Sequence, residues 1–357
     1  METMSTVHDQ AGESDQAEAL ARRIVELQPG HARAESRVID GLLQRGDADG
    51  AIARVKALHA AAPDDSTMRD IDALLARTLD RAGRPADAVS TWVRLQSEVA
   101  DRRLPLPPVT ADPAGTGWPD LAQADPEAPG ILMLWGPPGS MVERVAMTME
   151  SSGIPLCVDR LRPNPPEDDL QRYDTAQRLR DGQLTASEFA SRWRAAVPAR
   201  RPGIPASMPV ADWLLTWDNA LLHGLRAALP ETRLLVVVRD PRDMLLDWLA
   251  HGGPVPIGMR DVGESAKWLA ANLEHVADLQ DQDLLPHRVL KLDEVADDPQ
   301  ALAQALADAL GLHIRAVARE TIVPRFAAGH WRAYAEPLAE AFAVLTPVAQ
   351  RLGYPEA

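Results

Sequence analysis

The stretch ILMLWGPPGSMVERV, residues 131–145, decides how the chain is interpreted. Five apolar residues lead into a turn of glycine and proline, Gly136 to Ser140, and the residues that follow have helical spacing. This order predicts a buried strand, a tight turn and the start of a helix, where backbone N–H groups can hold an anion. The turn contains no Lys or Arg, so a plain strand-to-helix corner explains the same residues equally simply.

The remainder of residues 131–357 repeats this alternation of strand and helix. RLLVVVR (233–239) is another unbroken apolar run, and HRVLKLDEV (287–295) contains a weaker one. Short runs of this kind are typical of parallel strands that are buried on both faces. We therefore expect an α/β domain with a parallel central sheet that includes strands near 131–135 and 234–238.

Residues 1–100 have a different pattern, with apolar residues at helical spacing from about residue 16. VELQPGHARA and LHAAAPDDST place Pro29 and Pro63 34 positions apart, and RGDADGAI and RAGRPADAV place Gly46 and Gly83 at equivalent turns. The first spacing is the period of tetratricopeptide repeats, so the segment resembles a short array of them. An unrelated helical bundle is the alternative.

Residues 101–130 contain seven prolines, which cannot continue a helix. We interpret this segment as a Pro-rich linker between the helical array and the α/β domain.

Composition restricts the classes of partner. The 357 residues carry a formal net charge of -15, which disfavours nucleic acid as a partner because its phosphates would be repelled. The one cysteine, Cys157, excludes an intrachain disulfide. No apolar run reaches the length of a membrane span, and the polar start has no secretory-signal pattern, so we expect a cytoplasmic protein with no membrane partner. The histidines lack the paired spacing of a metal site.

The segment LPETRLLVVVRDPRDMLLDWLAHG, residues 229–252, resembles the strand, loop and helix that hold the 3′-phosphate of PAPS (3′-phosphoadenosine 5′-phosphosulfate) in sulfotransferases. HRVLKLDEVADDPQALAQALADALGL (287–312) resembles the late strand and helix of that family, and GHWRAYAEPLAEAFAVLTPVAQRLGYP (329–355) its closing segment. With the repeats in front, the order is similar to that of bacterial tetratricopeptide-repeat sulfotransferases, which are related to tyrosylprotein sulfotransferases.

The resemblance implies a P-loop-like sulfotransferase domain with PAPS as the donor. It assigns roles to seven residues. The PAPS-binding residues would be Gly136, Gly139, Ser140, Arg239, Asp247 and Arg332, and the catalytic base would be Asp159.

Two of these seven positions, and one further position, depart from the family pattern. Gly136 stands where the family has an arginine, Asp247 where it has a serine, and Ser207 where a lysine contacts the donor. A carboxylate beside a phosphate is repulsive unless an arginine neutralises it. These departures indicate a degenerate PAPS site with weak or absent donor binding.

Two of the retained residues also have structural explanations. Asp159 follows a predicted strand and could be a solvated aspartate, and Arg239 could pair with a neighbouring carboxylate in an Asp-rich turn. The neighbouring carboxylates belong to Asp240, Asp243 and Asp247.

Three functions remain at this stage. The first is transfer of a sulfuryl group from PAPS to a hydroxyl, such as a tyrosine on a protein or peptide that the repeats present. The second is an inactive relative that binds a protein partner through its repeats. The third, a nucleotide hydrolase or kinase, has little support because the chain has no GK[ST] motif.

Overall fold

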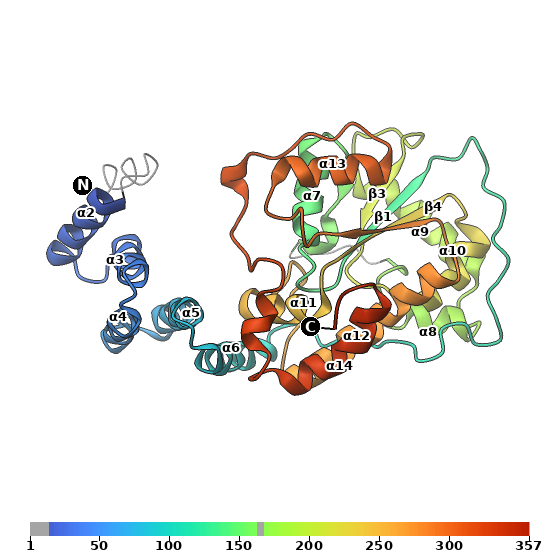
Figure 1. The fold of residues 1–357 in the computed structure, drawn as a ribbon. Coiled ribbons are helices and arrows are strands. Elements are labelled where there is room, and N and C mark those ends of the chain that lie inside the picture. Colours follow the sequence, from blue (N-terminus) through green and yellow to red (C-terminus); the bar gives the residue numbers. More distant parts are fainter. Residues whose placement is uncertain (1–13, 163–167, 357) are drawn as a thin grey trace. The chain divides into compact units, whose positions relative to one another are not determined.

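A computed structural model describes residues 14–162 and 168–356 of the chain (Figure 1). The chain divides into two compact units, Met1–Val99 and Ala100–Ala357. In the described ranges, no helix combines the length and the apolar character that crossing a membrane requires.

The described part of the first unit is helical, as the periodicity predicts. Its helices are α2 (Ser14–Leu27), α3 (Ala32–Gln44), α4 (Ala48–Ala60), α5 (Asp65–Arg81) and α6 (Pro85–Ala100). Pro29 and Pro63 lie just beyond α2 and α4, while Gly46 and Gly83 follow α3 and α5 with φ angles of 80° and 68°. Such angles favour glycine, so the turn positions inferred from the sequence echoes are confirmed.

Small and apolar side chains hold these helices together in sequence order. Helix α2 packs on α3, α3 on α4, and α4 on α5. Ile24 and Val38 meet between α2 and α3, and Ile39 and Val55 meet between α3 and α4. Helices α2 to α5 therefore bury their apolar stripes mainly against their neighbours in the chain.

The second unit contains a five-stranded sheet in which every pairing is parallel, with the order β2-β3-β1-β4-β5. The strands are β1 (Ile131–Trp135), β2 (Leu156–Cys157), β3 (Val210–Trp213), β4 (Thr232–Val238) and β5 (His287–Lys291). The predicted α/β class and parallel sheet are therefore confirmed, and the predicted strands match β1 and β4.

Helices separate the strands along the chain and cover the sheet. They are α7 (Val142–Ser151), α8 (Thr175–Arg180), α9 (Ala186–Arg200), α10 (Leu222–Ala228), α11 (Pro241–His251), α12 (Val262–Asp281), α13 (Pro299–Leu310) and α14 (Ala339–Arg351). Short 3-10 helices lie at η1 (Asp159–Leu161), η2 (Asn219–Leu221), η3 (Arg319–Thr321) and η4 (His330–Tyr334). Helices α11, α12 and α14 pack on one another, on the side of the sheet away from α7 and α13 (Figure 1).

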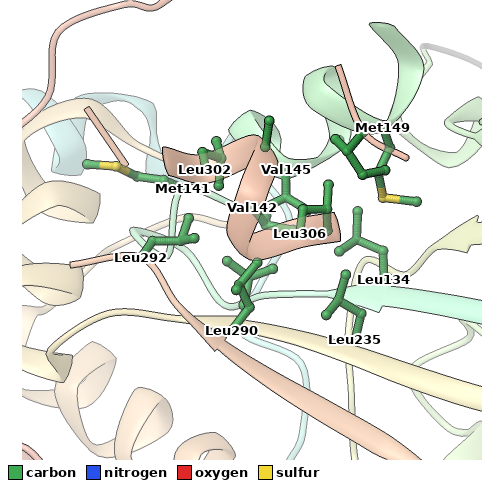
Figure 2. Close-up of a cluster of buried hydrophobic side chains, with 14 of the residues drawn as sticks. Leu134, Met141, Val142, Val145, Met149, Leu235, Leu290, Leu292, Leu302 and Leu306 are labelled. Carbon is green, nitrogen blue, oxygen red and sulfur yellow. The ribbon is translucent and has the colours of Figure 1, made fainter. Parts of the chain in front are cut away.

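The core on the α7 side is shown in Figure 2. Leu134 and Leu235 point from the sheet toward Val145 of α7, and Leu302 and Leu306 of α13 cover the same space. Burying apolar area of this kind stabilises a fold by about 25 cal/mol per Å². This packing fixes where β1 ends and α7 begins.

The Pro-rich segment 101–130 belongs to the second unit, to which it is tied by hydrogen bonds. Thr110 N donates to Asp218 Oδ2 at 2.7 Å, Trp268 Nε1 to Pro107 O at 2.7 Å, and Ala122 N to Arg226 O at 2.8 Å. Prolines leave carbonyls of this segment without a local donor. Other parts of the unit supply donors to several of these carbonyls, since Trp268 donates to Pro107 O, Tyr173 to Pro105 O and Arg226 to Pro119 O.

Candidate functional site

The turn between β1 and α7 lies at the carboxyl edge of the sheet, where open α/β folds place their ligands. Gly139 has a φ of 79°, and Met141, which precedes α7, has a φ of 63°. Ser140 N donates to Pro137 O at 3.1 Å, and Val142 N donates to Ser140 Oγ at 3.3 Å. Two of the amides that could hold an anion are therefore satisfied inside the turn.

The same turn is closely packed, since residues 136–141 are all buried. A Cβ added at Gly139 would lie 2.0 Å from the carbonyl oxygen of Met244 in α11. A Cβ added at Gly136 would lie 2.5 Å from Ser140 Oγ and 2.9 Å from Val237 O. The backbone of neighbouring elements therefore occupies the space around the turn, and a side chain at either glycine would displace it.

Arg239 follows β4 directly and lies next to this turn, because β1 and β4 are paired neighbours. It is 1% exposed, and its Nη2 donates to Phe326 O at 2.9 Å. Its Nε and Nη1 have no hydrogen-bond partner among the described residues. The sheet thus brings Gly136, Gly139, Ser140 and Arg239 to one edge.

Among the described residues, Arg239 makes no ion pair with Asp240, Asp243 or Asp247. Asp240 pairs instead with Arg242 at 2.7 Å. Asp243 accepts hydrogen bonds from the backbone of Gly329 at 2.6 Å and of Trp331 at 2.9 Å. Asp240 and Asp243 thus have other partners, and Nε and Nη1 of Arg239 have none within the described ranges.

Asp247 is 1% exposed, in the middle of α11. Burial raises the pKa of this carboxyl to about 6, although the charges of Arg325 and Arg239 act in the opposite direction. Its Oδ2 lies 3.4 Å from Arg325 Nη1, and its Oδ1 has no hydrogen-bond partner among the described residues. A partly charged carboxyl at this position opposes the binding of a phosphate.

Residues 322–331, named here the strap, cross the carboxyl edge beside the turn. Arg144 Nη2 donates to Val323 O at 2.9 Å, and Arg325 Nη2 lies 3.2 Å from Glu143 Oε1. With the bond from Arg239 to Phe326, these contacts fix the strap to α7 and to the end of β4. Arg144 and Arg239 therefore hold the backbone of the strap, while Arg325 of the strap pairs with carboxylates.

The carboxylate of Asp159, in η1, is not free, because Arg200 binds it. Arg200 donates to both of its oxygens, at 2.8 and 2.9 Å. Burial alone would raise the pKa of Asp159, but the hydrogen bonds and charge of Arg200 outweigh it and hold the pKa below its usual value. A carboxylate stabilised in this way is a poor proton acceptor.

Arg200 also belongs to a buried charge network around Asp212 of β3. Asp212 is 0% exposed and accepts hydrogen bonds from Arg200, Arg160 and Trp193 Nε1. Arg160 also pairs with Asp168 at 2.8 Å. The sequence analysis missed this network, although an aspartate inside the apolar run VADWLL was a signal that a buried cation must lie nearby.

Arg332 is exposed, and its guanidinium carbon lies 4.8 Å from the centre of the Trp331 ring. The guanidinium carbon of Arg242 lies 3.7 Å from the same ring. Arg332 thus contacts an aromatic ring, whereas the other residues assigned to donor binding lie at the turn, at the end of β4 and in α11.

Ser207 is placed differently from what the sequence comparison implied. It is exposed and lies three residues before Val210, which is paired with Ile131 at the start of β1. Because β1 and β3 are parallel, Ser207 lies at the amino edge of the sheet, opposite to the turn. Its alignment with a donor-contacting lysine is therefore wrong, and it does not count as a lost contact.

No group of three or more His, Cys, Asp or Glu side chains in the described ranges is arranged to hold a metal ion. Comparison with family models, with curated proteins and with solved structures finds no match to this chain.

Proposed function

We propose that the chain is a sulfotransferase-like protein that does not transfer sulfuryl groups and that binds a protein or peptide through its helical array. The observation that supports the absence of sulfuryl transfer is the burial of residues 136–141. A phosphosulfate needs an open concavity lined with N–H groups. Here the backbone of α11 lies against Gly139, and Ser140 is 0% exposed.

Two further residues that the resemblance assigns to the site do not suit the donor either. Asp247, which the resemblance aligns with a phosphate-binding serine, is a buried carboxyl with a raised pKa, and Asp159 is held by Arg200 with a lowered pKa. Each lost charge-assisted hydrogen bond to a phosphate removes on the order of 1.5–3 kcal/mol of binding free energy. No catalytic step through PAPS follows from this arrangement.

The proposed binding of a protein or peptide rests on a groove in the first unit. It has a volume of about 840 Å³, and residues of α2, α3, α4 and α5 line it. Leu58, Ile71 and Leu74 supply apolar surface, while Arg54 and Arg77 supply hydrogen-bond donors. An apolar floor with a few polar groups suits a short peptide segment.

Sulfuryl transfer itself is the second candidate. The specific observation in its favour is Arg239, which is buried and has two guanidinium nitrogens, Nε and Nη1, without a partner among the described residues. Buried donors of this kind are normally satisfied, and an anion at the strand end would satisfy them. This candidate requires the strap to move.

Calorimetric titration with 3′-phosphoadenosine 5′-phosphate separates the two candidates without knowledge of the acceptor. We expect no binding at ligand concentrations up to the millimolar range. Micromolar binding that Arg239→Ala abolishes would overturn the proposal and establish the donor site. Binding that Arg239→Ala leaves unchanged would equally contradict an inactive site, while showing that this arginine is not part of it.

The helical groove has its own test, by selection of displayed peptides on the full chain. Ala57 lines the groove and Ala53 does not, although both are exposed on α4. Selected peptides should lose binding to Ala57→Trp and keep it in Ala53→Trp. Equal binding to the two variants, or failure to select any peptide, would show that the groove is not a peptide site.

A further inference from the structure

A second cavity lies in the α/β unit, at the edge of the sheet opposite to the turn. Its volume is about 670 Å³, within the range of small-molecule sites, which is roughly 300–1,000 Å³. Ile131 and Val210, the first residues of β1 and β3, contribute to its lining. The cavity is thus separate from the candidate site at the carboxyl edge.

The walls of this cavity are mainly apolar and come from separate parts of the unit. Helix α9 contributes Trp193 and Val197, and the loop before β3 contributes Ile204. The Pro-rich segment contributes Ala122 and Ala128, and the hydrogen bond from Ala122 to Arg226 fixes that segment. Apolar ligand surface placed here would be removed from water, which favours binding.

Arg201 also lines the cavity and is 5% exposed. Its Nη1 donates to Pro209 O at 2.8 Å and its Nη2 to Met208 O at 2.9 Å. Both acceptors are neutral, and Nε has no hydrogen-bond partner among the described residues. A guanidinium stays charged in proteins, so this buried cation has two carbonyls beside it but no carboxylate within the described part of the chain.

The other charged groups of the lining do not compensate Arg201. Glu231 is paired with Arg194, and Asp125 is exposed to solvent. The wall of a mainly apolar cavity therefore contains one positive charge that no carboxylate among the described residues neutralises. A ligand with a single negative charge would neutralise Arg201, whereas a doubly charged phosphate would bring more negative charge than Arg201 can neutralise.

We propose that this cavity binds a small amphiphilic carboxylate, with its apolar chain between α9 and the Pro-rich segment and its carboxylate against Arg201. The proposal is independent of peptide binding by the helical array, because every lining residue belongs to the α/β unit. It assigns a binding role to the Pro-rich segment, which forms part of the wall.

Octanoate and 1-octanol test the proposal, because they share a chain length and differ in the charge of the head group. Titration calorimetry on the full chain should show octanoate binding about tenfold more tightly than 1-octanol, the effect of one charge-assisted hydrogen bond. Arg201→Met should remove this preference. Arg192→Met, on α9 but outside the cavity lining, should retain it.

Ala206→Trp gives a second test that leaves Arg201 in place. Ala206 lines the cavity and is exposed, so an indole there should fill the cavity and abolish octanoate binding without unfolding the chain. If Arg201→Met does not fold, the two ligands and this variant decide the matter. Absence of octanoate binding, equal affinity for 1-octanol, or unchanged binding in Ala206→Trp would each overturn the proposal.

Discussion

Replacement of Gly139 by alanine should destabilise the α/β unit far more than the same replacement at Gly153. Both glycines have a φ of 79°, so the strain of placing an alanine in this conformation, about 1–2 kcal/mol, is common to both. The surroundings differ, because a Cβ at Gly153 meets nothing within 4 Å, whereas at Gly139 it would lie 2.0 Å from Met244 O. The pair isolates the contact between the turn and α11.

The magnitude follows from the overlap. Relief of a 2.0 Å contact requires the backbone of the turn or of α11 to move, and forced overpacking costs about 1–3 kcal/mol. Gly139→Ala should therefore lower the free energy of unfolding by about 2 kcal/mol more than Gly153→Ala. With a urea slope of about 2 kcal/mol/M, the midpoints should differ by about 1 M.

Urea unfolding followed by tryptophan fluorescence measures this difference. Eight of the nine tryptophans lie in the α/β unit and Trp92 lies in the first unit, so the signal reports mainly on the α/β unit. Midpoints for Gly139→Ala and Gly153→Ala within about 0.2 M would refute the reasoning. The space beside the turn would then be open, and the packing of the turn would no longer exclude a phosphate.

Two further predictions concern buried charge. The pKa of Asp247 is about 6 in the folded chain, above its ordinary value, so its proton stabilises the fold below about pH 4 and this contribution is lost as pH rises through 6. Asp247→Asn should match the wild type at pH 4 and be more stable by about 2–3 kcal/mol at pH 7, whereas a pH-independent difference would contradict the raised pKa. Arg200→Ala leaves Asp212 with one arginine fewer and should cost about 3–5 kcal/mol of unfolding free energy, while Arg192→Ala, in an exposed pair, should cost less than about 1. Equal decreases of the urea midpoint in Arg200→Ala and Arg192→Ala would show that the buried network stabilises the fold no more than the exposed pair does.

The strands that could be predicted from the sequence are those whose own residues indicate a buried strand. The sequences of β1 and β4 contain unbroken apolar runs, so burial of both faces of these strands could be inferred from their composition. Strand β2 has two residues, and β3 contains Asp212. An aspartate is compatible with a buried strand only when cations reach it, and the local sequence does not show that these are Arg160 and Arg200.

The candidate site was less predictable for the same reason. That Gly139 and Arg239 share an edge follows from adjacent parallel strands, and this could be inferred from the sequence. The burial of the turn depends on where α11 begins relative to it, which is a tertiary packing outcome. The role of the strap could not be inferred either, since Arg325 and Phe326 carry no motif.

The carboxyl edge contains several arginines, and their hydrogen bonds show why counting cations overestimates anion binding. Arg144 donates to Val323 O and Ala296 O, and Arg242 donates to Pro355 O and Glu356 O. Guanidinium groups used in this way bind backbone segments to the edge, and a ligand could engage them only by displacing those segments. Arg239 differs, because two of its donors lack a partner among the described residues while its third holds Phe326 O. The capacity of this edge to accept an anion therefore depends on release of the strap more than on the number of positive charges in the sequence.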